Sequence, residues 1–350
     1  MNVLVLAGGY SAERDVSLVS GGKVVEALRR KGHRAMLLDP YLSVEAMPSF
    51  EALYETYARE EYAHAISAAE PDLAVLKKQY GNGEDLLGRH VLDACKLADV
   101  VFLALHGACG ENGQLQAAFD LFGIRYTGSG FIGCMLSMDK AVANVVMRAH
   151  GIQTPKGEEV NIDGIESDAL NSILDNLNLP AVIKPCSGGS SVGITIVKKK
   201  EDIPRALAYV QAYESKILIE EYIAGRELTV GILEGRALPV LEIRPKQGFF
   251  DYANKYQAGM TDELCPAPIS KGLSGRLQAI ALDAHRALRL GDYSRADFIV
   301  DANDEIYCLE VNSLPGLTPA SLVPKEARAA GISYEDLCEK IVQLALKRKD

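Results

Sequence analysis

The sequence predicts an α/β domain built on a parallel sheet, followed by an α+β region built on antiparallel sheets. In the first third of the chain, apolar strands, tight turns and amphipathic helices alternate, starting with a strand over 3–7, the pair Gly8-Gly9 and a helix over 17–30. From residue 181 onward, short strands follow one another with few helices between them, a pattern typical of antiparallel pairing.

In the α/β domain, we expect strands over 34–39 and 100–105 to lie beside the opening strand. Open α/β sheets bind ligands at the carboxyl ends of their strands. The glycine-rich turns at 8–9 and 106–107 both follow such ends. The sequence therefore predicts that both turns face one ligand site.

The remaining elements are predicted from hydrophobic periodicity, helix caps and turn residues. A helix over 137–150 is expected to end at Gly151. The other expected helices cover 50–69, 201–213, 273–290 and 333–347, and the expected strands cover 181–184, 193–198, 216–222, 227–233, 237–244, 295–301 and 306–311.

Composition excludes several classes of protein. The 350 residues are 48% hydrophobic and 24% charged, which predicts a globular chain and excludes a disordered one. The net charge of −10 argues against nucleic acid as a partner, and the opening apolar run is far shorter than the roughly 20 residues that span a bilayer, so no membrane partner is expected. The seven cysteines are scattered without a C-x-x-C pair, which favours the cytoplasm over an oxidising compartment.

A lysine at the end of a strand and the loop that follows it form the first candidate site. Lys184 precedes a run of glycines and serines over 186–193 that includes Ser190 and Ser191. Such a loop can fold over phosphates, because glycine lets backbone N–H groups approach an oxyanion and lysine adds a positive charge. A plain β-hairpin turn would have a similar composition.

Two neighbouring strands form the second candidate. Period-2 alternation places Arg295 and Asp297 on one face of their strand, and Glu310 and Asn312 on one face of the next. Two carboxylates and an amide are suitable ligands for a nucleotide-bound magnesium ion, and Arg295 suits an anionic intermediate. A surface ion pair across a hairpin is the alternative.

Two further segments carry acidic groups near turns. The segment 219–227 contains Glu220, Glu221 and Glu227, which could bind the hydroxyls of a nucleoside, or could simply flank a hairpin. Glu13 follows the first strand and could bind a substrate ammonium group, or could belong to a helix-capping loop. His106 has the same two interpretations, as a ligand contact or as a loop histidine.

Together these segments resemble the D-alanine–D-alanine ligase family of the ATP-grasp superfamily, over nearly the whole chain. The motifs that carry the resemblance, in order, are GGYSAERDVSLVSG at 8–21, LHGACGENGQLQ at 105–116, YTGSG at 126–130, SMDK at 137–140, IKPCSGGSSVG at 183–193, RADF at 295–298 and LEVNSLPGLTPASLVP at 309–324.

The resemblance implies an N-terminal α/β (pre-ATP-grasp) substrate domain over 1–128 and a two-part ATP-grasp fold. Its central subdomain would cover 129–222 and its C-terminal catalytic subdomain 223–350. It implies ATP-dependent ligation of two D-alanine molecules through a D-alanyl phosphate, giving D-alanyl-D-alanine, ADP and phosphate for peptidoglycan precursors. A homodimer is the family expectation.

The resemblance also implies a role for each matched residue. Glu13, Ser190, Tyr256, Arg295 and Gly316 would be catalytic, and His106, Ser321 and Leu322 would join Glu13 and Arg295 in binding substrate. ATP would be bound by Lys140, Lys184, Ser190, Ser191, Glu220, Glu221, Tyr222, Ile223, Glu227 and Lys255. Asp297, Glu310 and Asn312 would hold two Mg²⁺ or Mn²⁺ ions.

Three alternatives stay open. Tyr256 favours an amine as the second substrate, but a ligase that joins D-alanine to D-serine or D-lactate would differ only in one pocket. A catalytically silent ATP-binding module is disfavoured because Arg295, Asp297, Glu310, Asn312 and Lys184 are all present. A Rossmann-type oxidoreductase fits the β-α-β start but lacks the G-x-G-x-x-G spacing.

Overall fold

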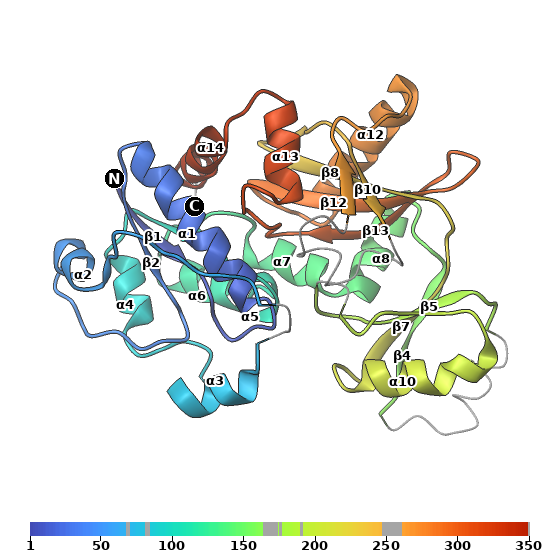
Figure 1. Cartoon of the computed structure of the whole chain (residues 1–350), viewed down its shortest axis with the longest axis horizontal. Coiled ribbons are helices and arrows are strands. Elements are labelled where there is room, and N and C mark those ends of the chain that lie inside the picture. The colour runs from blue at the N-terminus through green and yellow to red at the C-terminus, as the bar shows by residue number, and fades with distance from the viewer. Residues whose placement is uncertain are drawn as a thin grey trace.

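The protein, described here from a computed structural model, consists of a parallel α/β domain and two antiparallel sheets, as the sequence predicts (Figure 1). The structure describes residues 1–67, 71–80, 85–163, 174, 177–189, 192–246 and 261–348.

The N-terminal sheet consists of three parallel strands in the described residues. β1 (Asn2–Leu6) lies between β2 (Arg34–Leu38) and β3 (Val100–Leu103), and α1 (Arg14–Arg30) makes the first crossover. The strands are almost wholly buried because helices cover both faces. The other helices of this region are α2 (Phe50–Tyr57), α3 (Leu73–Tyr80), α4 (Val91–Lys96), α5 (Ala108–Glu111) and α6 (Gln114–Leu121).

Two of the predicted helices were wrong in extent. The helix expected over 50–69 stops at Tyr57, because Ala58 is extended and the chain then turns back over α1, where the Tyr62 hydroxyl accepts a hydrogen bond from the Leu37 amide at 3.1 Å. The helix expected over 137–150 begins later, as α8 (Lys140–Ala149), and residues 137 and 138 end a separate helix that was not predicted, α7 (Phe131–Met138). Asp139 interrupts them and caps α8 by accepting from two of its first amides.

A four-stranded antiparallel sheet follows, in the order β4-β7-β5-β6. It is formed by β4 (Gly157–Asn161), β5 (Ala181–Pro185), β6 (Thr195–Val197) and β7 (Lys216–Glu221), and α10 (Ile203–Gln211) packs on it after the short 3₁₀ helix η1 (Lys200–Asp202). Val160, Ile183 and Ile219 belong to its small separate core.

The described part of the last sheet has the strand order β11-β10-β8-β12-β13, with β9 added beside β8. Its strands are β8 (Arg226–Leu233), β9 (Arg236–Ala237), β10 (Leu241–Pro245), β11 (Thr261–Leu264), β12 (Tyr293–Val300) and β13 (Ile306–Asn312). α12 (Lys271–Ala287) packs with α8 on one face and α13 (Leu322–Ala329) on the other, because the apolar residues of β8 and β12 alternate between two cores.

The last helix, α14 (Tyr334–Lys347), returns to the N-terminal domain. It lies against α1 (Figure 1), and Leu337 and Ile341 belong to the same core as β1 and β3. Arg30 and Glu335 form an ion pair at 2.8 Å across this contact. The boundaries expected at 128 and 222 stay predictions. Within the described residues, no helix has both the length and the apolar character that a membrane crossing needs.

Candidate active site

Three neighbouring pockets lie where the N-terminal domain and the two antiparallel sheets meet. The Arg295 pocket, of about 180 Å³, is lined by residues of both chain halves, including Glu13, His106, Glu111, Arg295, Glu310, Asn312, Gly316, Ser321 and Leu322. The Lys184 pocket, of about 510 Å³, lies between the two antiparallel sheets and is lined by Lys184, Glu220, Glu221, Tyr222, Ile223, Glu227, Glu242 and Arg244 among others.

A third, bridging pocket of about 100 Å³ joins the other two. It shares Gly189 and Glu310 with the Arg295 pocket, and Lys184 and Glu227 with the Lys184 pocket. Lys140 also lines it. The three pockets are therefore adjacent, with shared residues between neighbours.

Antiparallel pairing of β12 and β13 builds the C-terminal wall of the Arg295 pocket. Arg295 pairs with Asn312 in register, and Asp297 pairs with Glu310. The Arg295 guanidinium donates through Nε and Nη2 to the two oxygens of Asp297, at 2.8 and 2.6 Å. Asn312 and Thr229 also donate to Asp297. Arg295 is thus held in one orientation by a bidentate contact.

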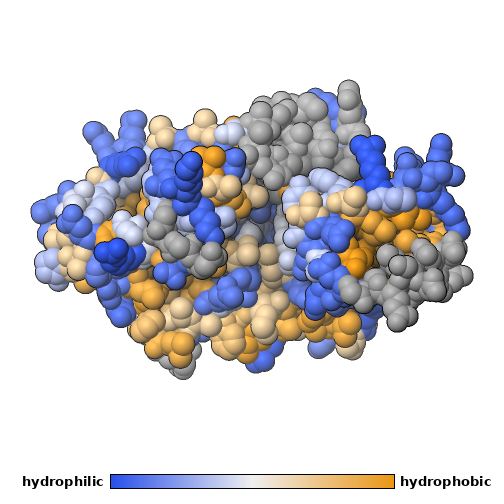
Figure 2. Space-filling model, turned by 90° about the horizontal axis from the view of Figure 1, so that it is seen from below, coloured by the Kyte–Doolittle hydropathy of each residue, from blue (hydrophilic) through white to orange (hydrophobic). Residues whose placement is uncertain are grey.

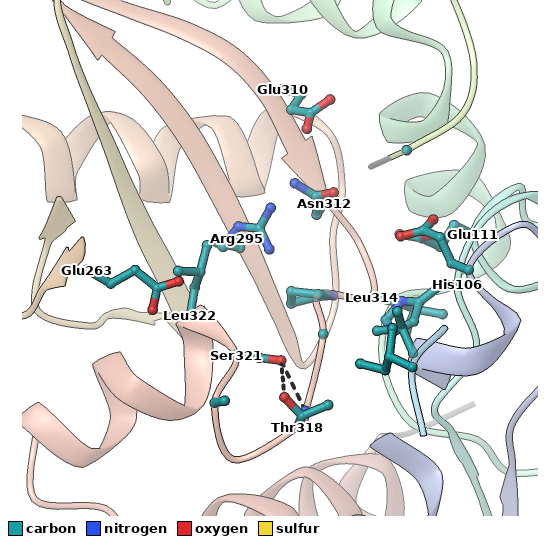
Figure 3. Close-up of a pocket in the computed structure, with 17 residues that line it drawn as sticks. His106, Glu111, Glu263, Arg295, Glu310, Asn312, Leu314, Thr318, Ser321 and Leu322 are labelled. Atoms are coloured by element: carbon teal, nitrogen blue, oxygen red, sulfur yellow. Dashed lines mark hydrogen bonds between the residues drawn. The ribbon is translucent and has the colours of Figure 1, made fainter. Parts of the chain in front are cut away.

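The opposite wall comes from loops at the carboxyl ends of β1 and β3. Figure 3 shows Arg295 and Asn312 on the C-terminal side of the pocket, facing Glu111 and His106 on the N-terminal side. Glu13 lies at the start of α1, where its amide is bonded to the Ser11 hydroxyl at 3.1 Å. The pocket therefore needs residues nearly 300 positions apart in the sequence.

Burial changes the protonation of this N-terminal wall. It lowers the pKa of His106, so the ring is neutral near neutral pH although the Glu13 carboxylate opposes this shift. Burial, reinforced by the negative charge of Glu13, raises the pKa of Glu111 to about 8. Glu111 also accepts a hydrogen bond from the Gly107 amide at 2.7 Å.

The loop before α13 closes the pocket. Ser321 lies directly before the helix, and its hydroxyl accepts a hydrogen bond from the Thr318 amide at 3.1 Å. The free backbone amides of a helix N-terminus attract negative charge. Ser321 and Leu322 are therefore placed to receive a carboxylate.

In the Lys184 pocket, the two residues expected on the ATP side contact each other. Lys184 at the end of β5 forms an ion pair with Glu220 on β7 at 2.6 Å, and Asn144 on α8 donates to the same carboxylate at 2.8 Å. Both members of the ion pair are buried. Apolar side chains such as Val182, Ile196 and Leu309 complete a wall that suits a flat aromatic ring.

In the bridging pocket, Lys140 connects the glycine-serine loop to the carboxylates. Its Nζ donates to the carbonyl of Gly188 at 2.7 Å and lies 3.5 Å from Glu310 Oε2. Lys140 is buried at the start of α8. The arrangement places two lysines, Lys140 and Lys184, beside the carboxylates of Asp297 and Glu310.

The structure brings together all of the predicted site residues that it describes. Each of them lines one of the three pockets. Ser190, Ser191, Lys255 and Tyr256 lie outside the described residues.

Sequence reasoning missed several residues of the cleft: Glu111, Asn144, Thr229, Glu242 and Arg244. Glu111 lies inside the motif at 105–116 and could have been selected as a third acid near Glu13. Glu242 and Arg244 alternate along a strand, which is the pattern that identified Arg295 and Asp297. The contacts of Asn144 and Thr229 have no local sequence signal.

The two antiparallel sheets with a charged cleft between them, joined to a parallel α/β domain, define the ATP-grasp class of enzymes. Family models described as "D-ala D-ala ligase N-terminus" and "D-ala D-ala ligase C-terminus" match residues 2–129 and 146–343. The chain belongs to the D-alanine–D-alanine ligase family.

Individual relatives agree with this assignment. The D-alanine–D-alanine ligase of Pediococcus pentosaceus is 40% identical over 349 residues, covering 98% of this chain and 97% of the relative. The crystal structure of the Bacillus anthracis ligase complexed with ATP matches with a TM-score of 0.74 at 28% identity, over 99% of this chain and 98% of that chain. The VanG D-Ala:D-Ser ligase of Enterococcus faecalis also matches with a TM-score of 0.74 at 28% identity, over 98% of both chains.

Proposed function

We propose that this protein joins two D-alanine molecules at the expense of ATP, forming D-alanyl-D-alanine, ADP and phosphate for peptidoglycan precursors. The adjacency of the three pockets supports the proposal most directly. A nucleotide in the Lys184 pocket can direct its phosphates through the bridging pocket toward a substrate held beside Arg295.

The reaction has two steps. A carboxylate oxygen of the first D-alanine attacks the γ-phosphorus of ATP, the bond to ADP breaks, and a D-alanyl phosphate forms. The amine of the second D-alanine, after losing a proton, attacks the acyl carbon, and phosphate leaves from the tetrahedral intermediate. No protein nucleophile is needed, so positioning and electrostatic stabilisation provide the catalysis.

Residues of the Arg295 pocket bind the substrates in this proposal. Glu13 binds the ammonium group of the first D-alanine, with Ser190 and Tyr256 as its expected partners. Arg295 and the Gly316 amide stabilise the oxyanion of the tetrahedral intermediate. Ser321 and Leu322 bind the carboxylate of the second D-alanine, which the helix N-terminus favours.

Residues of the other two pockets bind ATP. Lys184 contacts the phosphates. The family resemblance assigns Lys140 to the adenine side, but Lys140 lines the bridging pocket and not the Lys184 pocket, so we assign it to the phosphates as well. Glu220, Glu221, Tyr222, Ile223 and Glu227 hold adenine and ribose, and Ser190, Ser191 and Lys255 are the remaining expected contacts. Lys184 must then divide its charge between Glu220 and the nucleotide, since it lies 2.6 Å from that carboxylate.

The donor set fits magnesium or manganese ions. Asp297 and Glu310 supply carboxylates from paired positions, and Asn312 supplies an amide beside them. The described residues contain no group of three or more His, Cys, Asp or Glu that could hold a metal. Mg²⁺ usually binds through one or two carboxylates plus substrate phosphates. The two ions would neutralise phosphate charge when bound.

A homodimer is the proposed assembly, in the cytoplasm. Figure 2 shows hydrophobic residues gathered along the lower edge of that view, where the helices at the back of Figure 1 lie. Exposed apolar side chains on α6, α7 and α8 and just after α6 are Leu121, Phe122, Phe131, Met135, Val142 and Val145. All seven cysteines are free, as a reducing compartment allows. Sedimentation of the unchanged protein and of M135E would test this assembly. If this surface forms the dimer interface, M135E should sediment as a monomer.

Product analysis tests the reaction. Phosphate release would be measured with ATP, Mg²⁺ and D-alanine alone, then with D-serine or D-lactate added, and each product would be identified by mass. D-alanyl-D-alanine from D-alanine alone is the expected result. A mixed product favoured at low D-alanine would move the chain to the D-serine or D-lactate ligases. No phosphate release in any mixture would refute the ligase proposal.

A further inference from the structure

A buried glutamate on α13 lacks a well-formed hydrogen bond in the described part of the chain. Glu326 is 0% exposed, and neither carboxyl oxygen has a partner at full hydrogen-bond geometry, although the backbone amide of Gly231 interacts with the group more weakly. Leaving a buried polar group unsatisfied costs about 1–3 kcal/mol. A residue that only packed the helix against the sheet would be more stabilising as an apolar side chain, so the polar group calls for another explanation.

The position of this carboxyl group relates it to Arg295. α13 lies over the face of the sheet that carries Leu233 and Tyr293. A Cβ atom added to Gly231 would lie 2.4 Å from Glu326 Oε2, so the carboxyl group occupies the space that the missing side chain leaves. Gly231 is the register partner of Arg295. The carboxyl group of Glu326 therefore lies in the space that the side chain of a directly opposed cross-strand partner of Arg295 would fill.

Arg295 has a second side that Asp297 does not cover. Its Nε and Nη2 atoms are directed at Asp297, and a guanidinium carries five N–H donors in all. The Arg295 side chain is only 14% exposed, so wholly apolar surroundings would leave its remaining N–H groups poorly solvated. The Glu326 carboxyl group is close enough to Arg295 for the two to interact electrostatically.

We propose that Glu326 is a positioning residue for Arg295, which together with Asp297 keeps the arginine in its catalytic orientation. This inference rests on the proposed function, which assigns the oxyanion to Arg295. The protonation of Glu326 is compatible with it: burial raises the pKa of Glu326 well above its ordinary value, although Arg295 opposes the shift. A glutamine at this position would also place an oxygen beside Arg295.

Two substitutions of the same length separate this role from packing. E326Q keeps an oxygen and the shape, whereas E326M keeps only the length. We expect E326Q to retain kcat within about threefold. We expect E326M to lose roughly tenfold or more in kcat, since a misplacement of about 1 Å at a reacting centre can cost 10²-fold. The KM for ATP should stay within about threefold in both variants, because the Lys184 pocket is untouched.

Thermal unfolding provides the second readout. E326M removes an unsatisfied polar group, so its melting temperature should equal or exceed that of the unchanged protein. A purely structural residue would show the same stability change with no loss of kcat. E305M makes the same chemical change at an exposed glutamate before β13 and should alter neither quantity.

Each outcome decides between the ideas. If the wild-type protein is active and E326M has the same kcat, the positioning role is overturned. It is also overturned if E326Q loses as much kcat as E326M, because glutamine keeps the oxygen. If E326M does not fold, the double variant G231A/E326A fills the same space with a methyl group, and normal kcat in it would overturn the role. An inactive wild-type protein would instead refute the proposed function.

Discussion

The Arg295 pocket and the Lys184 pocket each contain a buried cation joined to a carboxylate, but the two ion pairs are built differently. Arg295 makes two hydrogen bonds to Asp297, two positions further along its own strand. Lys184 reaches across to Glu220 on the neighbouring strand with a single contact. A bidentate guanidinium is fixed in direction, whereas an ammonium group is a point charge on a flexible stem.

The difference matches what each pocket has to do in the proposed reaction. A tetrahedral oxyanion exists only briefly, so its partner must be in place beforehand. A nucleotide binds and leaves in every cycle, so a lysine that can exchange Glu220 for a phosphate suits the task. The comparison teaches that one buried ion pair of the site can hold a cation ready for a transition state, while the other can release its cation to a ligand.

The largest effect is expected at the fixed pair. R295A should lower kcat by about 10²–10³-fold, as loss of an oxyanion donor does in other enzymes, while the KM for ATP changes little. Steady-state phosphate release measures both constants. R295K should be nearly as damaging, because lysine cannot make both bonds to Asp297. Turnover of R295A equal to that of the unchanged protein would remove Arg295 from the oxyanion.

Acid should weaken the sheet of Arg295 more than the sheet of Lys184. Burial lowers the pKa of His285, which contacts Ser294 beside Arg295 at 2.8 Å, from 6.5 to about 4. As pH falls, His285 takes up a proton in the unfolded chain before it does so in the folded protein. Its contribution to the free energy of unfolding is therefore fully present above pH 6.5 and decreases by up to about 3 kcal/mol as pH falls toward 4. Residues 157–221 contain no histidine.

Urea unfolding at pH 7, 6, 5 and 4 measures this effect. H285Q keeps a polar group near Ser294 but cannot titrate, so its free energy of unfolding should depend less on pH across this range. Parallel curves for the two proteins would show that His285 does not contribute to acid sensitivity.

At the exchangeable pair, K184M should act mainly on nucleotide binding. We expect the KM for ATP to rise by about 10–100-fold, since a hydrogen bond to a charged group contributes about 1.5–3 kcal/mol. The fall in kcat should be smaller than in R295A. E220Q is the matched variant, because it keeps the contact to Asn144 and frees Lys184. An ATP KM in K184M within twofold of normal would contradict the exchange model.

The smallest effect is expected at the carboxylate shared by the bridging and Arg295 pockets. E310Q should raise the magnesium concentration needed for half-maximal rate by about tenfold, because one anionic ligand is lost. A chelator should abolish phosphate release in both proteins, and added Mg²⁺ should restore it. A magnesium titration that E310Q leaves unchanged would remove Glu310 from the metal site.

The fixed pair was predictable from the sequence and the exchangeable pair was not. Arg295 and Asp297 are two positions apart on a strand, so period-2 alternation alone places them on one face. Lys184 and Glu220 are 36 positions apart, and their contact depends on the pairing of β5 with β7. Alternation says which face a residue occupies but not which strand lies beside it.

The same distinction explains the errors in the fold. Long periodic segments such as α12 and α14 were predicted nearly in full. The helix expected over 50–69 was too long because the Tyr62 contact to Leu37 is tertiary. The helix expected over 137–150 started too early, although Asp139 carries a readable N-cap signal at the true start of α8. Glu326 was missed because its importance depends on a glycine 95 positions earlier.

The return of α14 to the N-terminal sheet has a consequence for how the chain matures. Leu337 and Ile341 fill the core that β1 and β3 begin, so the core of the N-terminal domain is completed by residues that are synthesised about 300 positions later. A nascent chain that has not yet reached residue 334 exposes apolar surface on α1 and β3. Proofreading by chaperones or proteases can therefore distinguish an unfinished chain from a finished one at the N-terminal domain, far from the missing residues in sequence.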